Sequence, residues 1–358
     1  MRPPFKKAGI NEAIELAKAG LSSPLKQLIM VGPVQQKINK RRPFELSKVS
    51  KDYPYFSHLL NQIMQEKMQE LPDFSDDSKI AVMSDFGGEH PGALFNTYSF
   101  LFMAYNKVGV FEQKVISLRE KYGLLAPYSE FAYKKLQSGA RSRALQEYLQ
   151  LVDQFIHGAI ITVAIDKQIK TVFGADKTQA HPVMIEQLEK EGLGKWSGPT
   201  AEKVMRVTHI IAAFASLLTH ENQRLLWYCD KDPINEDGKN RDFKRTQQIF
   251  ARVLGMYLTH GLDIVGFGKS FDEKCHLDDL LSVPDLAAGV VQDLLLQHKT
   301  NAGNPEVPEK RMVMKWIATP SKYLSKIIVQ ITRMEDGEIG YGTVDMTINE
   351  GLVSNIRT

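Results

Sequence analysis

Cysteines and long apolar stretches are what this 358-residue sequence has least of. Two cysteines occur, Cys229 and Cys275, which excludes a disulfide framework and a four-cysteine zinc site and fits a reducing cytoplasm. The longest strongly apolar stretches, Gly158–Ile165 and Ile210–Leu218, are far shorter than the roughly 20 residues that cross a bilayer. The amino-terminal segment has neither a continuous apolar core nor a small-residue cleavage site, so we expect no secretory signal. We therefore expect a cytoplasmic protein without a membrane partner.

Positive charge is concentrated at the start of the chain, although the net formal charge is +3. Residues 1–51 hold 11 lysines and arginines against three glutamates, a charge of +8, which leaves −5 for the remainder. A basic segment on a mildly acidic body indicates a polyanionic partner. We expect nucleic-acid contacts from Lys37, Lys40, Arg41 and Arg42. A soluble segment that binds nothing stays an open alternative.

Hydrophobic periodicity divides the chain into three expected parts. Residues 1–75 predict a helical, basic extension with helices near 10–19, 23–31 and 54–70. Residues 76–300 predict an α/β domain, a mixed sheet flanked by helices, because apolar strand runs alternate with helical stripes. Residues 301–358 predict a linker followed by a β-hairpin around Glu335–Glu338.

Within the central part, the expected elements follow from the spacing of apolar residues. Strands are predicted near 79–85, 97–105, 159–165, 224–229 and 262–267, and helices near 142–157, 201–218, 243–258 and 286–298. Residues 167–198 are expected to be irregular and residues 299–311 to be a linker. Pro284 is expected to mark the start of the last helix of this part, because proline is favoured in a first turn.

Three familiar motifs are present only as fragments. Gly266–Ser270 ends like a phosphate-binding loop, but position 263 is an aspartate where that loop needs glycine, so a strand-end loop is the better interpretation. Asp85-Phe86-Gly87 matches the kinase metal-binding triplet without any of the motifs that precede it in kinases. The nine histidines form no zinc-binding pattern.

Four acidic residues stand at or near the edges of the expected strands and helices. They are Asp85, Glu130, Asp230 and Asp285. Singly, each has a structural explanation; Asp285, for example, would be favoured at a helix amino terminus by the helix dipole. Together they are the donor set of a two-metal site, in which carboxylates hold two Mg²⁺ or Mn²⁺ ions that activate water and stabilise a leaving oxygen.

The same four residues carry a resemblance to a bacterial and phage family with a ribonuclease-H-like fold, classified as domain of unknown function thirty-eight hundred. The family opens with a strand ending in Asp-Glu-Ser-Gly, matched by Asp85 in IAVMSDFGG. Its later segments are matched by Glu130 in SEFAYKKL, Asp230 in LLWYCD and Asp285 in LLSVPDLAAG. The resemblance covers about residues 79–298 and implies a ribonuclease-H-like mixed sheet, and the family's frequent placement in mobile elements and defence systems implies a role against phage.

This sequence departs from the family pattern at two positions. Phe86 replaces the glutamate of the opening signature, and Ala132 replaces a histidine two residues after Glu130. Glu89, four residues after Asp85, is the candidate replacement for the missing glutamate. Either change would weaken metal binding or require a different proton carrier.

The sequence therefore predicts a metal-dependent nuclease that hydrolyses phosphodiester bonds in DNA or RNA. Asp85 and Asp230 would bridge or flank the metals, and Glu130 and Asp285 would complete the shell. Lys134 and Lys135 are expected to neutralise phosphate charge. The alternatives left open are an inactive ribonuclease-H-like subunit that binds nucleic acid or a partner protein, and a phosphate-ester hydrolase acting on nucleotides.

Overall fold

The computed structural model describes most of the chain after residue 38. The described residues are 39–125, 128, 130–137, 139–236, 241–270, 276–300, 307–349 and 352–357, with the backbone alone for 347–349 and 352–357. The expected helices near 10–19 and 23–31, and Lys37, lie outside this part.

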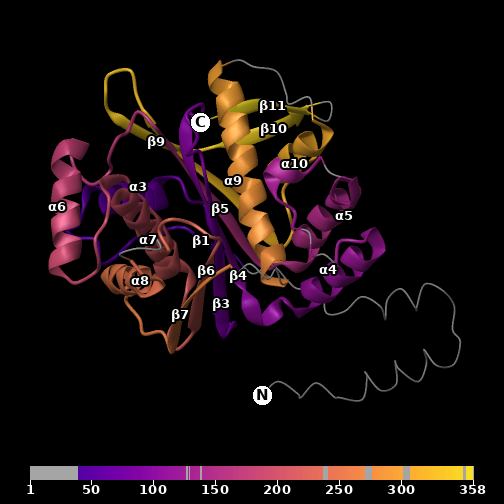
Figure 1. Ribbon diagram of the computed structural model, residues 1–358, viewed down its shortest axis with the longest axis horizontal. Coiled ribbons are helices and arrows are strands. Elements are labelled where there is room, and N and C mark those ends of the chain that lie inside the picture. Colours follow the sequence, from indigo (N-terminus) through magenta and orange to yellow (C-terminus); the bar gives the residue numbers. More distant parts are fainter. Residues whose placement is uncertain are drawn as a thin grey trace, which may run out of the picture. The chain divides into compact units, whose positions relative to one another are not determined.

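A seven-stranded mixed sheet forms the centre, in the order β7-β6-β3-β4-β5-β8-β9 (Figure 1). Its strands are β3 (Lys79–Gly87), β4 (Phe95–Ala104), β5 (Gly158–Asp166), β6 (Arg224–Cys229), β7 (Ile264–Lys269), β8 (Leu324–Arg333) and β9 (Ile339–Thr343). β4 is antiparallel to both β3 and β5, whereas β6 and β7 run parallel to β3. The first five strands thus lie in the order third, second, first, fourth, fifth with the second reversed. This is the ribonuclease-H-like arrangement, so the expected fold class is confirmed.

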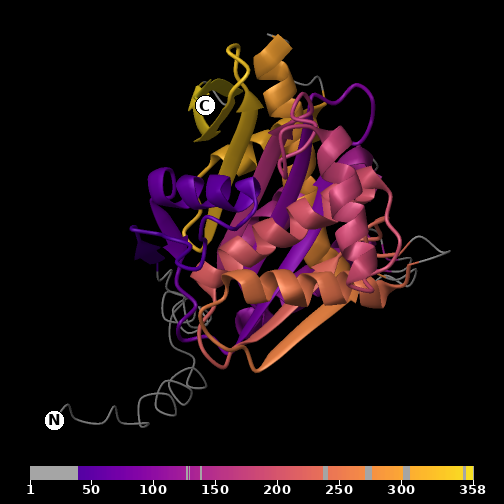
Figure 2. The same cartoon turned by 90° about the vertical axis from the view of Figure 1, so that its left-hand side faces the viewer.

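Helices cover both faces of the sheet, as Figures 1 and 2 show. One face carries α4 (Gly109–Tyr122), α5 (Gly139–Phe155), α9 (His276–Thr300) and α10 (Pro308–Ala318); the other carries α3 (Tyr55–Glu66), α6 (Lys177–Lys190), α7 (Gly198–Leu218) and α8 (Phe243–Tyr257). Alternation along β3 separates the two cores: Ile80 and Val82 pack with α7 and α8, while Ala81 and Met83 pack with α9. Asp85, on the parity of Ala81 and Met83, therefore belongs to the α9 face.

Three expectations about helices were wrong. Residues 167–198 are not irregular, because α6 forms there; the Asp176 carboxylate caps it by accepting a hydrogen bond from the Thr178 N–H at 2.6 Å. The last helix of the central part does not start near Pro284: α9 begins at His276, with Asp278 and Asp279 in its first turn, where acidic residues are favoured. The expected linker over 299–311 contains the end of α9 and the start of α10.

The segments on either side of the central part join the same body. Phe56 and Leu60 of α3 lie in the same buried cluster as Trp227 of β6, and β8 and β9 extend the central sheet. The expected hairpin is confirmed in the antiparallel pair β8–β9. The short sheets β1 (Asn39–Arg41) with β2 (Glu70–Pro72), and β10 (Asp345–Asn349) with β11 (Leu352–Arg357), are separate. Packing thus continues across both expected domain boundaries, which themselves stay predictions. No described helix has the length and apolarity needed to cross a membrane.

A buried polar network ties α3, α7 and α8 together. The Tyr257 hydroxyl lies 2.6 Å from Ser57 Oγ and 2.7 Å from His209 Nδ1. Burial lowers the pKa of His209 to about 3, so its imidazole is neutral at pH 7. The network therefore consists of neutral groups, and among the described residues His209 Nε2 has no hydrogen-bond partner.

We expect Tyr257→Phe to lower the free energy of unfolding by about 1–3 kcal/mol, because Ser57 and His209 would lose a buried hydrogen-bond partner. Urea unfolding at pH 7 measures the change. Tyr55→Phe is the matched control, since Tyr55 is 48% exposed and its loss of a hydroxyl should cost under about 0.5 kcal/mol. Equal stabilities for the two variants would show that the network contributes nothing.

Candidate active site

Two of the expected acids meet at the carboxyl ends of neighbouring parallel strands. In the register of β3 and β6, Ser84 lies opposite Cys229, so Asp85 and Asp230 follow side by side. The Asp230 N–H donates to the Ser84 carbonyl at 3.3 Å, which continues the ladder by one residue. Ser270, directly after β7, donates its hydroxyl to Asp230 Oδ1. The strand ends therefore fix Asp230 from both sides.

Helix α9 supplies the third acid, from its interior. Asp285 is nine residues past the first residue of α9, so the explanation of this acid as a helix amino-terminal residue is wrong. Asp278 and Ser282 precede it at seven and three residues, spacings that place all three on one side of the helix. Asp278 is a buried carboxylate that the sequence interpretation missed.

Glu130 completes the cluster from the segment between α4 and α5. Three residues later, the Tyr133 N–H donates to Asp285 Oδ2 at 2.8 Å and fastens this segment to α9. Arg141 donates to the Glu130 carbonyl at 3.3 Å, and Lys135 Nζ lies 3.5 Å from Glu130 Oε1.

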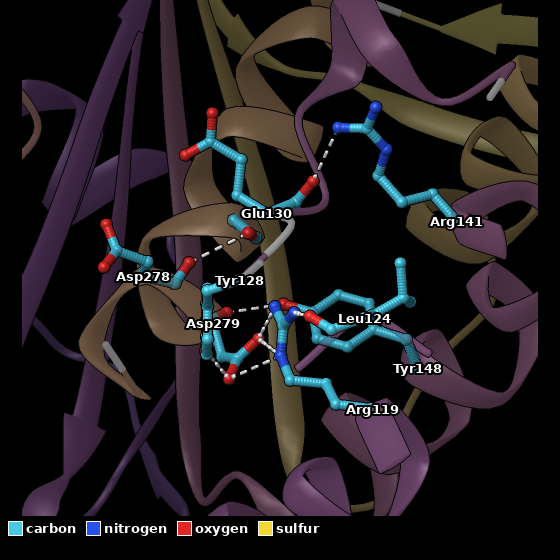
Figure 3. Close-up of polar contacts among 9 residues, drawn as sticks. Arg119, Leu124, Tyr128, Glu130, Arg141, Tyr148, Asp278 and Asp279 are labelled. Atoms are coloured by element: carbon cyan, nitrogen blue, oxygen red, sulfur yellow. Dashed lines mark hydrogen bonds and ion pairs between the residues drawn. The ribbon is translucent and has the colours of Figure 1, made fainter. Parts of the chain in front are cut away.

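The acids converge on a small cleft of about 100 Å³. It is lined by Glu130, Ala132, Asp230, Asp278, Leu281, Ser282 and Asp285. Asp85 adjoins it, because Asp285 lies close enough for its charge to raise the pKa of Asp85. Figure 3 shows the carboxylates of Glu130 and Asp278 on the same side of the segment that carries Tyr128. The structure thus brings together the four acids predicted from the sequence and adds Asp278.

Burial and mutual repulsion raise the pKa values of Asp85 and Asp285. Burial, and then the charges of Asp285 and Asp230, raise the pKa of Asp85 well above its usual value. The pKa of Asp285 is raised to about 6, first by burial, against the opposing effect of the Tyr133 N–H, and further by the charges of Asp230 and Glu130. Both shifts favour the protonated acid, as expected of two neighbouring carboxylates that repel one another.

The donor set suits a hard divalent cation, because every acidic side chain in the cleft offers carboxylate oxygens and a cation would offset their repulsion. Within the part of the chain that the structure describes, no three His, Cys, Asp or Glu side chains converge closely enough to hold one metal ion. The residues therefore fit a metal in chemistry, while their side chains are not gathered around a single point.

The two departures from the family pattern have different surroundings. Phe86 packs on the opposite face of β3, 5.9 Å from the Tyr98 ring and 6.1 Å from the Phe100 ring. Ala132 lines the cleft, so the position of the family's histidine does face the acids. Glu89 forms an ion pair with Lys203, which also pairs with Asp232. Glu89 is therefore engaged outside the cleft.

The expected nucleic-acid residues fall in two places. Lys40 donates to the Leu217 carbonyl at the end of α7, near the amino end of β6, and desolvation lowers its pKa. Arg41 and Arg42 beside it are exposed. Lys134 and Lys135 are exposed next to Glu130. Because Asp230 follows the carboxyl end of β6, only the second pair adjoins the cleft.

Two partners of the acids had a weak signal in the sequence. Asp278 and Asp285 are seven residues apart, which is two helical turns, but Pro284 concealed the helix that joins them. Ser270 follows a strand as Asp85 and Asp230 do, in the segment that we interpreted as a strand-end loop.

No protein-family model and no curated protein matches the chain. Solved structures with a similar fold include ribonuclease H2 from Pyrococcus horikoshii OT3, at 13% identity over 67% of this chain and 85% of that one, with a TM-score of 0.31. A chain of the PCNA:RNase HII complex from Archaeoglobus fulgidus shares 16% identity over 69% of this chain and 91% of its own, with a TM-score of 0.29. Similarity this low carries no argument about activity, and the fold assignment rests on the strand order.

We expect Asp85→Asn and Asp285→Asn to stabilise the metal-free protein at pH 8. A folded-state pKa above the unfolded value of about 4 means that stability is present below pH 4 and is lost as pH rises through about 6 for Asp285. Removing the Asp285 charge should therefore raise the free energy of unfolding by about 2 kcal/mol at pH 8 and by much less at pH 4, and Asp85→Asn should act in the same direction.

Urea unfolding in EDTA at the two pH values measures this difference. Asp263→Asn is the matched control, because Asp263 forms an exposed ion pair with Arg224 away from the cleft and should change stability by under about 1 kcal/mol. Destabilisation by Asp85→Asn at pH 8 would show that the carboxylates do not repel one another.

Proposed function

We propose that this protein is a metal-dependent nuclease that hydrolyses phosphodiester bonds in DNA or RNA at the acidic cleft. The observation that supports the proposal is the convergence of Asp85, Glu130, Asp230 and Asp285, from four separate segments, on one cleft at the carboxyl ends of β3 and β6. A structural role alone would not require half-buried carboxylates to lie close enough to raise one another's pKa. Their order along the chain is also that of the family named above.

The position of each side chain in the cleft indicates the role that it would have. Asp85 and Asp230, held by adjacent strands, would flank the metals, while Glu130, Asp285 and Asp278 would close the shell from the other side. Two Mg²⁺ or Mn²⁺ ions bound there would supply an activated water and neutralise charge on the leaving oxygen. The Tyr133 N–H and the Ser270 hydroxyl orient the carboxylates of Asp285 and Asp230, respectively. Lys134 and Lys135 would attract the phosphate backbone.

A second candidate has its own support. Ala132 stands in the cleft where the family has a histidine, and the described acids are not gathered around one point. These observations favour an inactive ribonuclease-H-like subunit that binds nucleic acid or a partner protein.

We expect the purified protein to cleave labelled DNA or RNA in Mg²⁺ or Mn²⁺ and not in EDTA. Asp85→Asn and Asp285→Asn should each lower kcat by at least about 100-fold, because each removes a carboxylate from the shell of the metals. Single- and double-stranded substrates of both kinds would be compared by gel electrophoresis. Asp263→Asn should keep full activity.

Cleavage that both cleft variants abolish identifies the activity and its substrate together. Tight binding without cleavage, at equal strength with and without metal and in both variants, would contradict the nuclease and support the binding subunit.

We expect the double variant Lys134→Ala with Lys135→Ala to flatten the salt dependence of nucleic-acid binding. Loss of two phosphate contacts should reduce the slope of log affinity against log salt by roughly 1.4–1.8. Fluorescence anisotropy with the full chain, at salt concentrations from about 50 to about 300 mM, measures the slope. The matched double variant Arg41→Ala with Arg42→Ala lies at the other end of β6 and should change it less. The opposite order would place the binding surface at the basic segment.

A further inference from the structure

A fully buried arginine lies directly behind the acidic cleft. Arg119, in the last turn of α4, is 0% exposed, and its Nε donates to Asp279 at 2.9 Å from Oδ1 and 3.2 Å from Oδ2. Its Nη2 reaches the same carboxylate, and its Nη1 donates to the Leu124 carbonyl at 3.0 Å. The guanidinium therefore joins the first turn of α9 to the chain leaving α4 (Figure 3).

Tyr128 extends this contact toward Glu130. Its ring lies 3.8 Å from the Arg119 guanidinium carbon, and its hydroxyl donates to Asp279 Oδ2. The Tyr148 hydroxyl donates to the Asp279 carbonyl at 2.5 Å. The Tyr148 ring stacks on the Phe131 ring, with 4.2 Å between the ring centroids. We call Arg119, Tyr128 and Asp279 the buried clamp.

Glu130 is held between two attachments to the same helix. Two residues before it, Tyr128 is fastened to Asp279; three residues after it, Tyr133 is fastened to Asp285. Asp278 lies next to Asp279 and lines the cleft, so the clamp is one residue from an acid on α9 and two residues from Glu130. The position of the Glu130 carboxylate relative to α9 depends on both attachments.

A buried ion pair is weak evidence for net stability, because desolvation of both charges offsets their attraction. Its geometry, however, is specific: the planar guanidinium fits one carboxylate and one aromatic face, which lysine would not reproduce. Catalytic carboxylates need supporting contacts of this kind, since small displacements of a ligand weaken a metal site.

We infer that the buried clamp is a positioning device that sets the Glu130 carboxylate against Asp278 and Asp285. The inference rests on the proposed metal-dependent function. Arg119 and Tyr128 touch no substrate in this scheme and act through Glu130. Asp279, although adjacent to a cleft acid, belongs to the clamp and not to the shell of the metals.

Tyr128→Phe tests the clamp with the least disturbance, because it removes one hydroxyl and keeps the ring against Arg119. Tyr257→Phe is the control: it removes a buried hydroxyl from the network with Ser57 and His209 on the opposite face of the sheet, away from the cleft. The Mn²⁺ affinity of the full chain is measured by titration calorimetry, alongside the midpoint of urea unfolding. We expect Tyr128→Phe to weaken Mn²⁺ binding about tenfold and Tyr257→Phe to change it under about twofold.

A double-mutant cycle separates positioning from general loosening of the fold. If Tyr128 acts through Glu130, then Tyr128→Phe should weaken Mn²⁺ binding in the wild type and have no further effect in Glu130→Gln. An unchanged affinity in Tyr128→Phe, equal losses in Tyr128→Phe and Tyr257→Phe, or additive losses in the cycle would each overturn the inference while leaving the nuclease intact. A wild-type protein that binds no Mn²⁺ would overturn the proposed function and the clamp together.

Discussion

Repulsion between carboxylates at adjacent strand ends is the constraint on which the rest of the site depends. The parallel register of β3 and β6 places Asp85 beside Asp230, and α9 presses Asp285 against both. Three half-buried carboxylates this close together repel one another when all are ionised. A bound proton relieves the repulsion, and a divalent cation would relieve it at a pH where the acids are ionised. The strand register therefore sets the repulsion that any ligand of the cleft has to offset.

The two faces of the sheet differ in how much charge they contain. The face under α7 and α8 is filled by apolar side chains and closed by the neutral network around Tyr257. The face under α9 combines an apolar core with the cleft at the carboxyl ends of β3 and β6. A well-packed layer can offset the cost of buried charge in the other, which is how folded proteins commonly tolerate strained sites. The packing energy of one face therefore offsets the repulsion between the acids on the other.

Sequence periodicity was sufficient for the first five strands of the sheet, whereas the addition of β8 and β9 to its edge was not predicted. The strand Arg224–Cys229 was predicted to the residue, because a short apolar run ended by Asp230 and a charged loop has few other solutions. Position on a helix was harder to predict. Pro284 resembles a helix start, yet tertiary packing carries α9 through it, so Asp278 and the true place of Asp285 were missed. Contacts such as Ser270 with Asp230 join distant segments and have no local signal.

Asp278 and Asp279 show why residue type alone does not identify a site. They are neighbours in sequence, equally acidic and both buried, yet they face different surroundings. Asp279 meets Arg119, which compensates its charge, whereas Asp278 lines a cleft among other acids. Successive residues of a helix point about 100° apart. Asp279 therefore points toward the buried Arg119 and forms a structural ion pair, whereas Asp278 points toward the cleft as a candidate ligand.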